Sequence, residues 1–188
     1  MELIWIKRFK LYIIYQNIEI PPQETSIFSF SKLKSSVISV IIPTYNRAGF
    51  LEHAMRSVFD QTMPCGELII VDDGPTDETR HCVDRLSAQA PIPVIFIYQK
   101  NRGAAAARNT GIRAARGELI SFLDSDDRFV PEKLAIQSRA MGEHPQYLIS
   151  HTREIWYRHG TILNQKNKHR PSHGKIFEAC LKMCVVGM

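Results

Sequence analysis

Three carboxylates lie within four residues at the end of an apolar run, in the sequence ELISFLDSDD at residues 118–127. Successive side chains of a strand point to opposite faces, so Asp124 and Asp126 can share one side where the strand leaves the sheet. Two carboxylates on one side repel each other unless a cation lies close to them. The run therefore predicts a metal and phosphate site. The alternative is a helix N-terminus capped by Asp127 or a neighbour, and the run alone does not separate the two.

The elements that would position this run follow a regular pattern. Short apolar stretches of the kind found in parallel sheets covered on both faces occur at residues 37–42, 67–71, 94–98 and 119–123. Apolar residues at helical spacing, or an alanine-rich stretch ending at a glycine, occur between them at residues 50–59, 82–86 and 104–116. Strands alternating with helices predict an α/β fold, with a doubly wound, mostly parallel sheet and helices on both faces.

In such a sheet all the loops that follow the strands open on one edge, where ligands collect. Tyr45 could pack against a base there, Asp73 could accept a hydrogen bond from a base or a ribose, and Asp126 could hold a cation that bridges phosphates. Mg²⁺ or Mn²⁺ suits oxygen ligands of this kind. The glycine-rich motifs of dinucleotide-binding folds and P-loop proteins are missing from the sequence, which disfavours NAD binding and P-loop ATP hydrolysis.

Four motifs in this order closely resemble the family 2 glycosyltransferases. They are VISVIIPTYNR at 37–47, VDDGPTD at 71–77, NRG at 101–103 with ARNTGI at 107–112, and LDSDD at 123–127. The resemblance extends from residue 37 to about residue 145. It implies a fold of GT-A type and metal-dependent transfer of a sugar, with inversion, from a nucleotide-diphosphate sugar, commonly a UDP-sugar, to a glycan or lipid-linked acceptor.

The resemblance also implies roles for individual residues. Pro43 and Tyr45 would flank the base, Asp73 would read it, Asp124 would meet the ribose or the sugar, and Asp126 would be the ligand of Mg²⁺ or Mn²⁺. Asn101, Gly103 and Arg108 belong to the third motif and are expected to contact the nucleotide or the sugar.

Three expectations concern the other residues of these loops. Asp77 is predicted to be a helix cap, and Asp72 is predicted to be structural through hydrogen bonds within its loop. Pro75 stands where the family usually has Ser, and we expect it to stiffen the turn without removing the carboxylates.

Inverting transfer needs a general base, which in such families is an acid downstream of the metal motif, typically within a Glu-Asp pair. After residue 145 the only acids are Glu154 and Glu178, and neither matches that pattern, so no catalytic base is assigned. We therefore expect the chain to be incomplete at its C-terminus, with a partner covering the apolar side of a final helix near residues 175–181. A strand at 147–150 and a hairpin around 159–160 are also predicted.

Two alternatives to an active transferase remain. The chain could be a non-catalytic nucleotide-sugar-binding module or an inactive fragment. A nucleotidyltransferase would need a glycine-rich loop with Arg and Lys after the first strand, which residues 43–46 do not supply.

The composition fits one domain at 37–188 after an N-terminal extension and linker at 1–36. Of the 188 residues 44% are hydrophobic and 23% charged, and the net charge of +5 is scattered along the chain, so nucleic acid is not an expected partner. The four cysteines, without zinc-knuckle spacing, indicate free thiols. The basic, aromatic segment at 1–20 is compatible with peripheral membrane association. We expect a cytoplasmic protein, at the membrane face where family members assemble polysaccharides.

Overall fold

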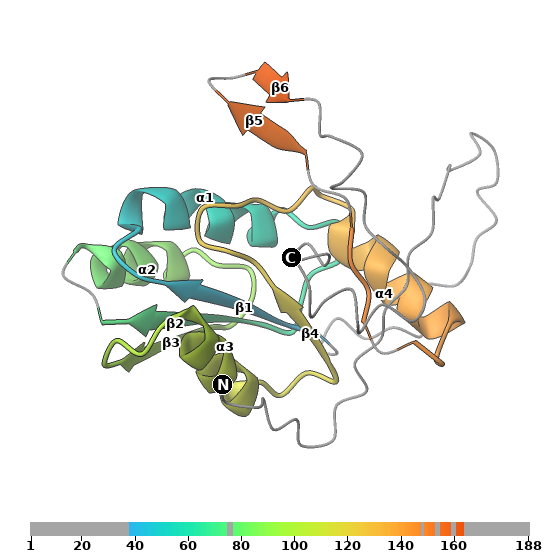
Figure 1. Ribbon diagram of the computed structural model, residues 1–188, viewed down its shortest axis with the longest axis horizontal. Coiled ribbons are helices and arrows are strands. Elements are labelled where there is room, and N and C mark those ends of the chain that lie inside the picture. Colours follow the sequence, from blue (N-terminus) through green and yellow to red (C-terminus); the bar gives the residue numbers. More distant parts are fainter. Residues whose placement is uncertain (1–37, 75–76, 148, 153–154, 159–160, 164–188) are drawn as a thin grey trace, which may run out of the picture. The chain divides into compact units, whose positions relative to one another are not determined.

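The computed structural model describes residues 38–74, 77–147, 149–152, 155–158 and 161–163 (Figure 1). Its centre is a parallel sheet of four strands in the order β3-β2-β1-β4. The strands are β1 (Ile38–Thr44), β2 (Glu67–Asp73), β3 (Val94–Gln99) and β4 (Leu119–Phe122). The α/β prediction is therefore confirmed. Strand β1 extends through Pro43, where the sequence predicted it would stop.

The central strand β1 fixes the order of the sheet because it pairs on both sides. All seven of its residues are buried, as are all seven of β2. Along one side Ser39 lies opposite Glu67, and along the other Ile38 lies opposite Leu119. Fully buried strands read as continuous apolar runs, which is why the sequence revealed them.

Helices cover both faces of the sheet, as predicted. They are α1 (Ala48–Phe59), α2 (Thr79–Ser87) and α3 (Ala104–Ala114), and a fourth helix, α4 (Lys133–Glu143), follows β4. One buried cluster joins α1 and α2 to side chains such as Ile42 and Ile70, and a second joins α3 to Ile41 and Ile69. Figure 1 shows α1 and α2 on one side of the sheet and α3 on the other.

The described residues form two compact units that divide between Ile136 and Gln137, within α4. The second unit contains the antiparallel hairpin of β5 (Trp156–Arg158) and β6 (Thr161–Leu163), which confirms the hairpin predicted around residues 159–160. The strand predicted at 147–150 was wrong, because residues 147, 149 and 150 are not in a strand. The extension at 1–36 and the helix predicted near 175–181 lie outside the described residues.

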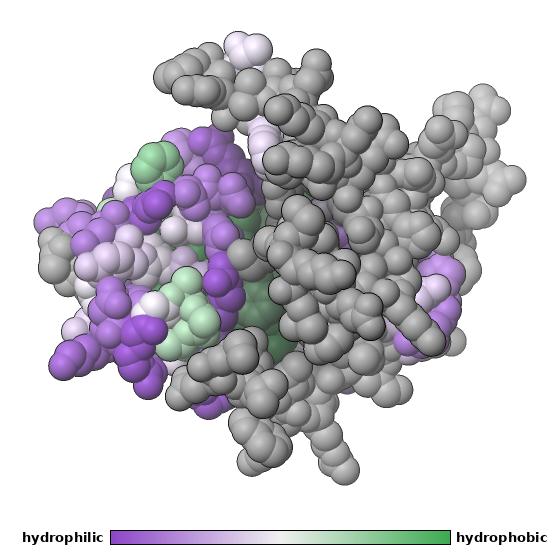
Figure 2. Space-filling model, in the orientation of Figure 1, coloured by the Kyte–Doolittle hydropathy of each residue, from purple (hydrophilic) through white to green (hydrophobic). Residues whose placement is uncertain are grey.

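The surface of the described residues is mainly hydrophilic in the view of Figure 2, where a hydrophobic area is also visible near the middle of the view. Cys65 and Cys82 are free and buried. Within the described ranges, every helix falls short of the length and apolar character that crossing a membrane requires.

Helix α3 lies unusually close to the central strand because small residues face it. Ala107 and Gly111 are its buried residues. A Cβ added to Gly111 would lie 2.4 Å from Cγ2 of Ile41, whose side chain is itself fully buried. This approach brings the start of α3 against the carboxyl end of the sheet, where the functional loops lie.

We expect Gly111→Ala to destabilise the fold by about 1–3 kcal/mol, because the added methyl group overpacks the contact with Ile41. Gly49→Ala in α1 is the matched control, since its added Cβ would meet nothing within 4 Å. That control should be neutral or slightly stabilising. Urea unfolding of both variants measures the difference, and equal stability of the two would contradict the tight packing of α3.

Candidate functional site

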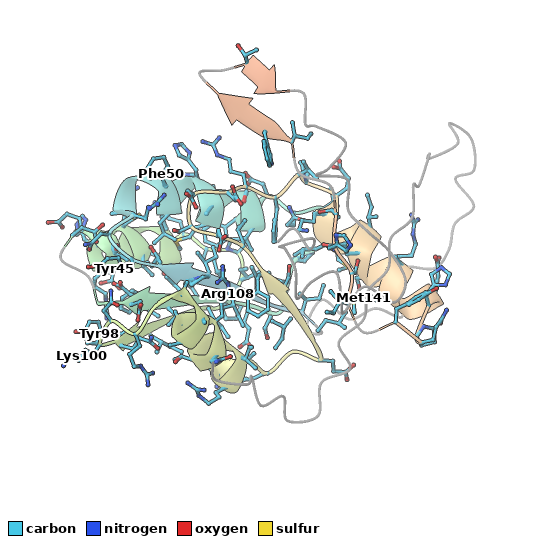
Figure 3. All side chains as sticks on the ribbon, in the orientation of Figure 1. Tyr45, Phe50, Tyr98, Lys100, Arg108 and Met141 are labelled. Atoms are coloured by element: carbon cyan, nitrogen blue, oxygen red, sulfur yellow. The ribbon has the colours of Figure 1, made fainter. Side chains whose placement is uncertain are left out.

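The candidate site lies at the carboxyl edge of the sheet, because all four strands run in parallel and end there. Tyr45 follows β1, Asp72 and Asp73 end β2, and the acidic run follows β4. In Figure 3, Tyr45, Tyr98 and Lys100 lie at this same end of the sheet. The structure thus brings together the loops that the sequence predicted would meet.

Arginines from two neighbouring segments hold the acidic run. Arg108 on α3 donates from Nη2 to Oδ1 of Asp124 at 2.6 Å. Arg47, just before α1, donates from Nη1 to Oδ2 of Asp126 at 2.6 Å. Both carboxylates are therefore neutralised by side chains of the chain itself, and the repulsion between them is offset.

The interpretation of the acidic run as a helix cap is wrong for the helix that follows it. The N–H of Asp127 closes a turn on the carbonyl of Asp124 at 3.0 Å, and α4 begins only at Lys133. A cap must lie directly before the first helical turn, and Asp127 does not. Asp124 and Asp126 therefore remain candidate residues for the predicted metal site.

Polar side chains at the end of α1 and just after it hold the chain beyond the acidic run. Ser57 Oγ accepts a hydrogen bond from the N–H of Phe129 at 3.1 Å. The side chain of Gln61 donates to the carbonyl of Val130 at 2.8 Å and accepts from the N–H of Leu134 at 3.0 Å. These contacts fix the end of the loop, so the acidic run is held between β4 and a rigid anchor.

Asp73 is fully engaged within the chain. Its carboxylate accepts hydrogen bonds from Nε2 of Gln99 at 2.6 Å and from the backbone N–H groups of Arg102 at 2.9 Å and Gly103 at 2.7 Å. The residue is only 3% exposed. Asp73 thus anchors the entry into α3, where Gly103 has a φ of 89° that favours glycine. Its contact with a base stays a prediction.

Asp72 has the opposite environment. It is fully buried, and among the described residues neither of its carboxylate oxygens has a hydrogen-bond partner. Thr44, its neighbour in register on β1, also has a buried hydroxyl without a partner in this part of the chain. Burial, reinforced by the charges of Asp77 and Asp73, raises the pKa of Asp72 to about 6.

The expectation that Asp72 is held by hydrogen bonds within its loop was therefore wrong. Pro75 and Thr76, which follow in the same loop, lie outside the described residues.

Asp77, predicted to be a helix cap, lies one residue before Glu78, the N-cap of α2, and its carboxylate contacts the first residues of two helices. It accepts hydrogen bonds from the N–H of Ala48 in α1 at 3.0 Å and from the N–H of Thr79 in α2 at 3.1 Å. The hydroxyl of Thr79 also donates to it at 2.6 Å. Burial alone would raise the pKa of Asp77, but these hydrogen bonds outweigh burial and lower it.

The remaining predicted residues differ in how accessible they are. Tyr45 is 48% exposed and could receive a ligand, whereas Pro43 is buried within β1. Asn101 and Gly103 are exposed, and Asn101 packs so closely on Gly74 that a Cβ there would lie 3.0 Å from the Asn101 nitrogen. The geometry does not by itself assign these residues a ligand.

Sequence reasoning assigned no role to Arg47 or Tyr98, which the structure places at the same edge. Arg47 was part of the quoted motif and was passed over, although it directly follows the tyrosine. Tyr98 lies opposite Asp72 on β3 and is 63% exposed. The signal that could have pointed to Tyr98 was an aromatic residue near the end of a strand at the edge of the sheet.

Among the described residues, no group of three or more His, Cys, Asp or Glu side chains could hold a metal ion. A cation at this edge would therefore need ligands from elsewhere. Mg²⁺ is commonly bound by one or two carboxylates together with the phosphates of a substrate, and Asp124 and Asp126 fit that pattern. The donor set suits a cation that binds with a nucleotide.

The contrast between Asp72 and Asp73 gives opposite predictions for two equivalent substitutions. Asp72→Asn should stabilise the protein at pH 7–8 by about 1–3 kcal/mol, because it removes a buried charge that has no partner. Asp73→Asn should destabilise it by about 2 kcal/mol, because charge-assisted hydrogen bonds are lost.

The gain from Asp72→Asn should depend on pH. Between the ordinary pKa of aspartate and about 6, the folded wild type binds more protons than the unfolded chain, so its stability falls as the pH rises. The advantage of the variant should therefore be full above pH 7 and vanish near pH 4. Thermal unfolding at several pH values measures it, and a pH-independent difference would contradict the raised pKa.

Comparison with known proteins identifies the family. Residues 39–182 match the family model described as Glycosyl transferase family 2. An uncharacterized glycosyltransferase of Rickettsia conorii is 37% identical over 164 residues, which cover 83% of this chain and 25% of the relative. The putative teichuronic acid biosynthesis glycosyltransferase TuaG of Bacillus subtilis is 35% identical, covering 80% of this chain and 59% of TuaG. The chain thus spans about a quarter of the length of the Rickettsia relative.

Solved structures agree with the sequence comparison. S. aureus TarS 1-349 in complex with UDP superposes with a TM-score of 0.53 at 29% identity, covering 57% of this chain and 32% of TarS. The mannosyltransferase PcManGT of Pyrobaculum calidifontis, in complex with GDP-Man and Mn²⁺, also gives 0.53 at 30% identity, covering 56% and 32%. The fold is of GT-A type, and the chain belongs to glycosyl transferase family 2.

Proposed function

We propose that the described edge of the sheet binds a nucleotide-diphosphate sugar, with a UDP-sugar as the first candidate, for metal-dependent and inverting transfer of the sugar. The observation that carries this proposal is the placement of Asp124 and Asp126, each held by an arginine, at the same edge as exposed Tyr45. Similar structures contain UDP, UDP-GlcNAc, or GDP-Man with Mn²⁺, which supports this class of donor.

Different residues of this edge would contact different parts of such a donor. Tyr45 offers an exposed ring to a base, and Asp124 offers a carboxylate whose orientation Arg108 fixes. Asp126 offers a more accessible carboxylate as the ligand of Mg²⁺ or Mn²⁺. A divalent cation, when bound there, would neutralise the charge that grows on the leaving diphosphate.

The acceptor is proposed to be a glycan or a lipid-linked sugar. The name of TuaG refers to teichuronic acid biosynthesis, which supports polysaccharide assembly as the setting. A location at the cytoplasmic face of the membrane would suit that role and is part of the proposal. A partner is proposed to cover the C-terminal region.

A non-catalytic donor-binding module is the second candidate, because the described residues offer contacts for a donor and no general base for inversion is assigned among them. Release of free sugar or transfer from UDP-sugars, assayed with and without candidate acceptors, separates the two candidates. Turnover supports the transferase, and binding without turnover supports the module.

Asp126→Ala should abolish the dependence of UDP binding on Mn²⁺, because it removes the more accessible of the two carboxylates that arginines hold. Isothermal titration of UDP with and without Mn²⁺ measures this effect. Asp84→Ala is the matched control, since Asp84 is an exposed aspartate paired with Arg80 on α2. The proposal would be wrong if the wild type bound UDP equally well with and without Mn²⁺, or if Asp126→Ala behaved like the control.

A further inference from the structure

The ion pair between Arg47 and Asp126 differs from its neighbour in its exposure. The side chains of Arg108 and Asp124 are 23% and 34% exposed, whereas those of Arg47 and Asp126 are 48% and 46% exposed. Exposed ion pairs add little net stability, so water and ions can readily replace their partners. Arg108 is thus a fixed clamp on Asp124, and Arg47 is an exchangeable partner of Asp126.

The backbone beneath Arg47 is fixed even though its side chain is exposed. The carbonyl of Arg47 accepts hydrogen bonds from the N–H groups of Phe50 at 2.9 Å and Leu51 at 3.0 Å, which begins α1. Asn46, directly before it, has a φ of 51° and turns the chain sharply out of β1. The guanidinium of Arg47 can therefore change its partner by rotation of its long side chain, while the backbone of Arg47 stays in place.

The sheet keeps the backbone of Arg47 close to the acidic run. Strands β1 and β4 are paired neighbours, and the N–H of Leu123 extends the pairing by donating to the carbonyl of Ile41 at 3.1 Å. The segments that follow both strands thus leave the sheet side by side. Besides Asp126, the only contact of the guanidinium given by the described residues is with the ring of Phe50, at 5.8 Å from its centroid.

Arg47 and a divalent cation would compete for Asp126, because both are positively charged and would lie against the same carboxylate. Oδ2 lies 2.6 Å from Nη1 of Arg47, which is full hydrogen-bond contact. A divalent cation on this carboxylate would be repelled by the guanidinium, which favours release of Arg47 from Asp126. The planar fork of N–H donors in the guanidinium matches the geometry of phosphate oxygens. Arg47 also lies at the N-terminus of α1, where anions are favoured.

We propose that Arg47 is a positioning residue that exchanges Asp126 for the diphosphate of the donor, so that the metal ion and the nucleotide bind cooperatively. This inference rests on the proposed function. In the absence of the nucleotide, Arg47 competes with the cation for Asp126. In its presence, the diphosphate gives the released guanidinium a new partner, and each ligand then strengthens the binding of the other.

Arg47→Ala should therefore change the two affinities in opposite directions. Binding of Mn²⁺ alone should tighten by about two- to five-fold, because an exposed competitor is removed. Binding of UDP with saturating Mn²⁺ should weaken by about ten-fold, because a charge-assisted contact is lost. Titration of Mn²⁺ followed by electron paramagnetic resonance, and calorimetric titration of UDP, measure both quantities on the full chain.

Two further variants make the result specific. Arg47→Lys keeps the charge without the planar fork, so Mn²⁺ affinity should stay near the wild-type value while UDP affinity falls part of the way. Arg56→Ala removes another exposed arginine of α1, which pairs with Glu52, and should change neither affinity.

The outcomes separate this inference from the function on which it rests. If Asp126→Ala removes the metal dependence but Arg47→Ala changes neither affinity, or weakens Mn²⁺ binding, the exchange is overturned and the donor site stands. If Asp126→Ala leaves Mn²⁺ binding unchanged, the donor site itself is wrong. Opposite shifts in Arg47→Ala, absent from Arg56→Ala, support the exchange.

Discussion

The parallel pairing of β1 with both β2 and β4 is the constraint on which the rest of the structure depends. Because β1 is buried along its whole length and paired on both sides, its neighbours must end at the same edge. Tyr45, the two aspartates of β2 and the acidic run are widely separated in the sequence, and this pairing alone brings them together. The close approach of α3 through Gly111 then adds Arg108 and the loop before α3 to that edge.

That edge gathers negative charge, which the fold balances in two different ways. Backbone N–H groups hold Asp73 and Asp77, and arginines hold Asp124 and Asp126. Asp72 has neither kind of partner among the described residues, and burial together with the charges of Asp77 and Asp73 raises its pKa. A carboxylate held by backbone groups is fixed by the fold, whereas one held by a side chain can change its partner. The carboxylates of the acidic run are thus the ones suited to receive a ligand.

Sequence alone predicted the sheet, its helices and the convergence of the loops, because continuous apolar strands and helical spacing are local signals. It assigned hydrogen bonds within the loop to Asp72, whereas the structure gives such bonds to Asp73. The two-residue period of a strand places neighbours on opposite faces, but which face brings hydrogen-bond donors depends on how α3 packs. Arg47 was overlooked for a similar reason, since its partner is distant in sequence. The strand predicted at 147–150 failed because a short apolar run without an apolar partner strand does not specify one.

The difference in exposure between the two arginine pairs explains how such an edge can be stable when empty and still bind a charged ligand. Carboxylates without counter-ions would repel each other and favour opening of the loop. Carboxylates that are buried and fully hydrogen-bonded would exchange their partners only at a high free-energy cost. The partly buried Asp124 pair keeps the loop in place, and the more exposed Asp126 pair can be exchanged at little free-energy cost. The proposed donor site uses both, because in the proposed exchange one carboxylate defines the position of the loop and the other is released.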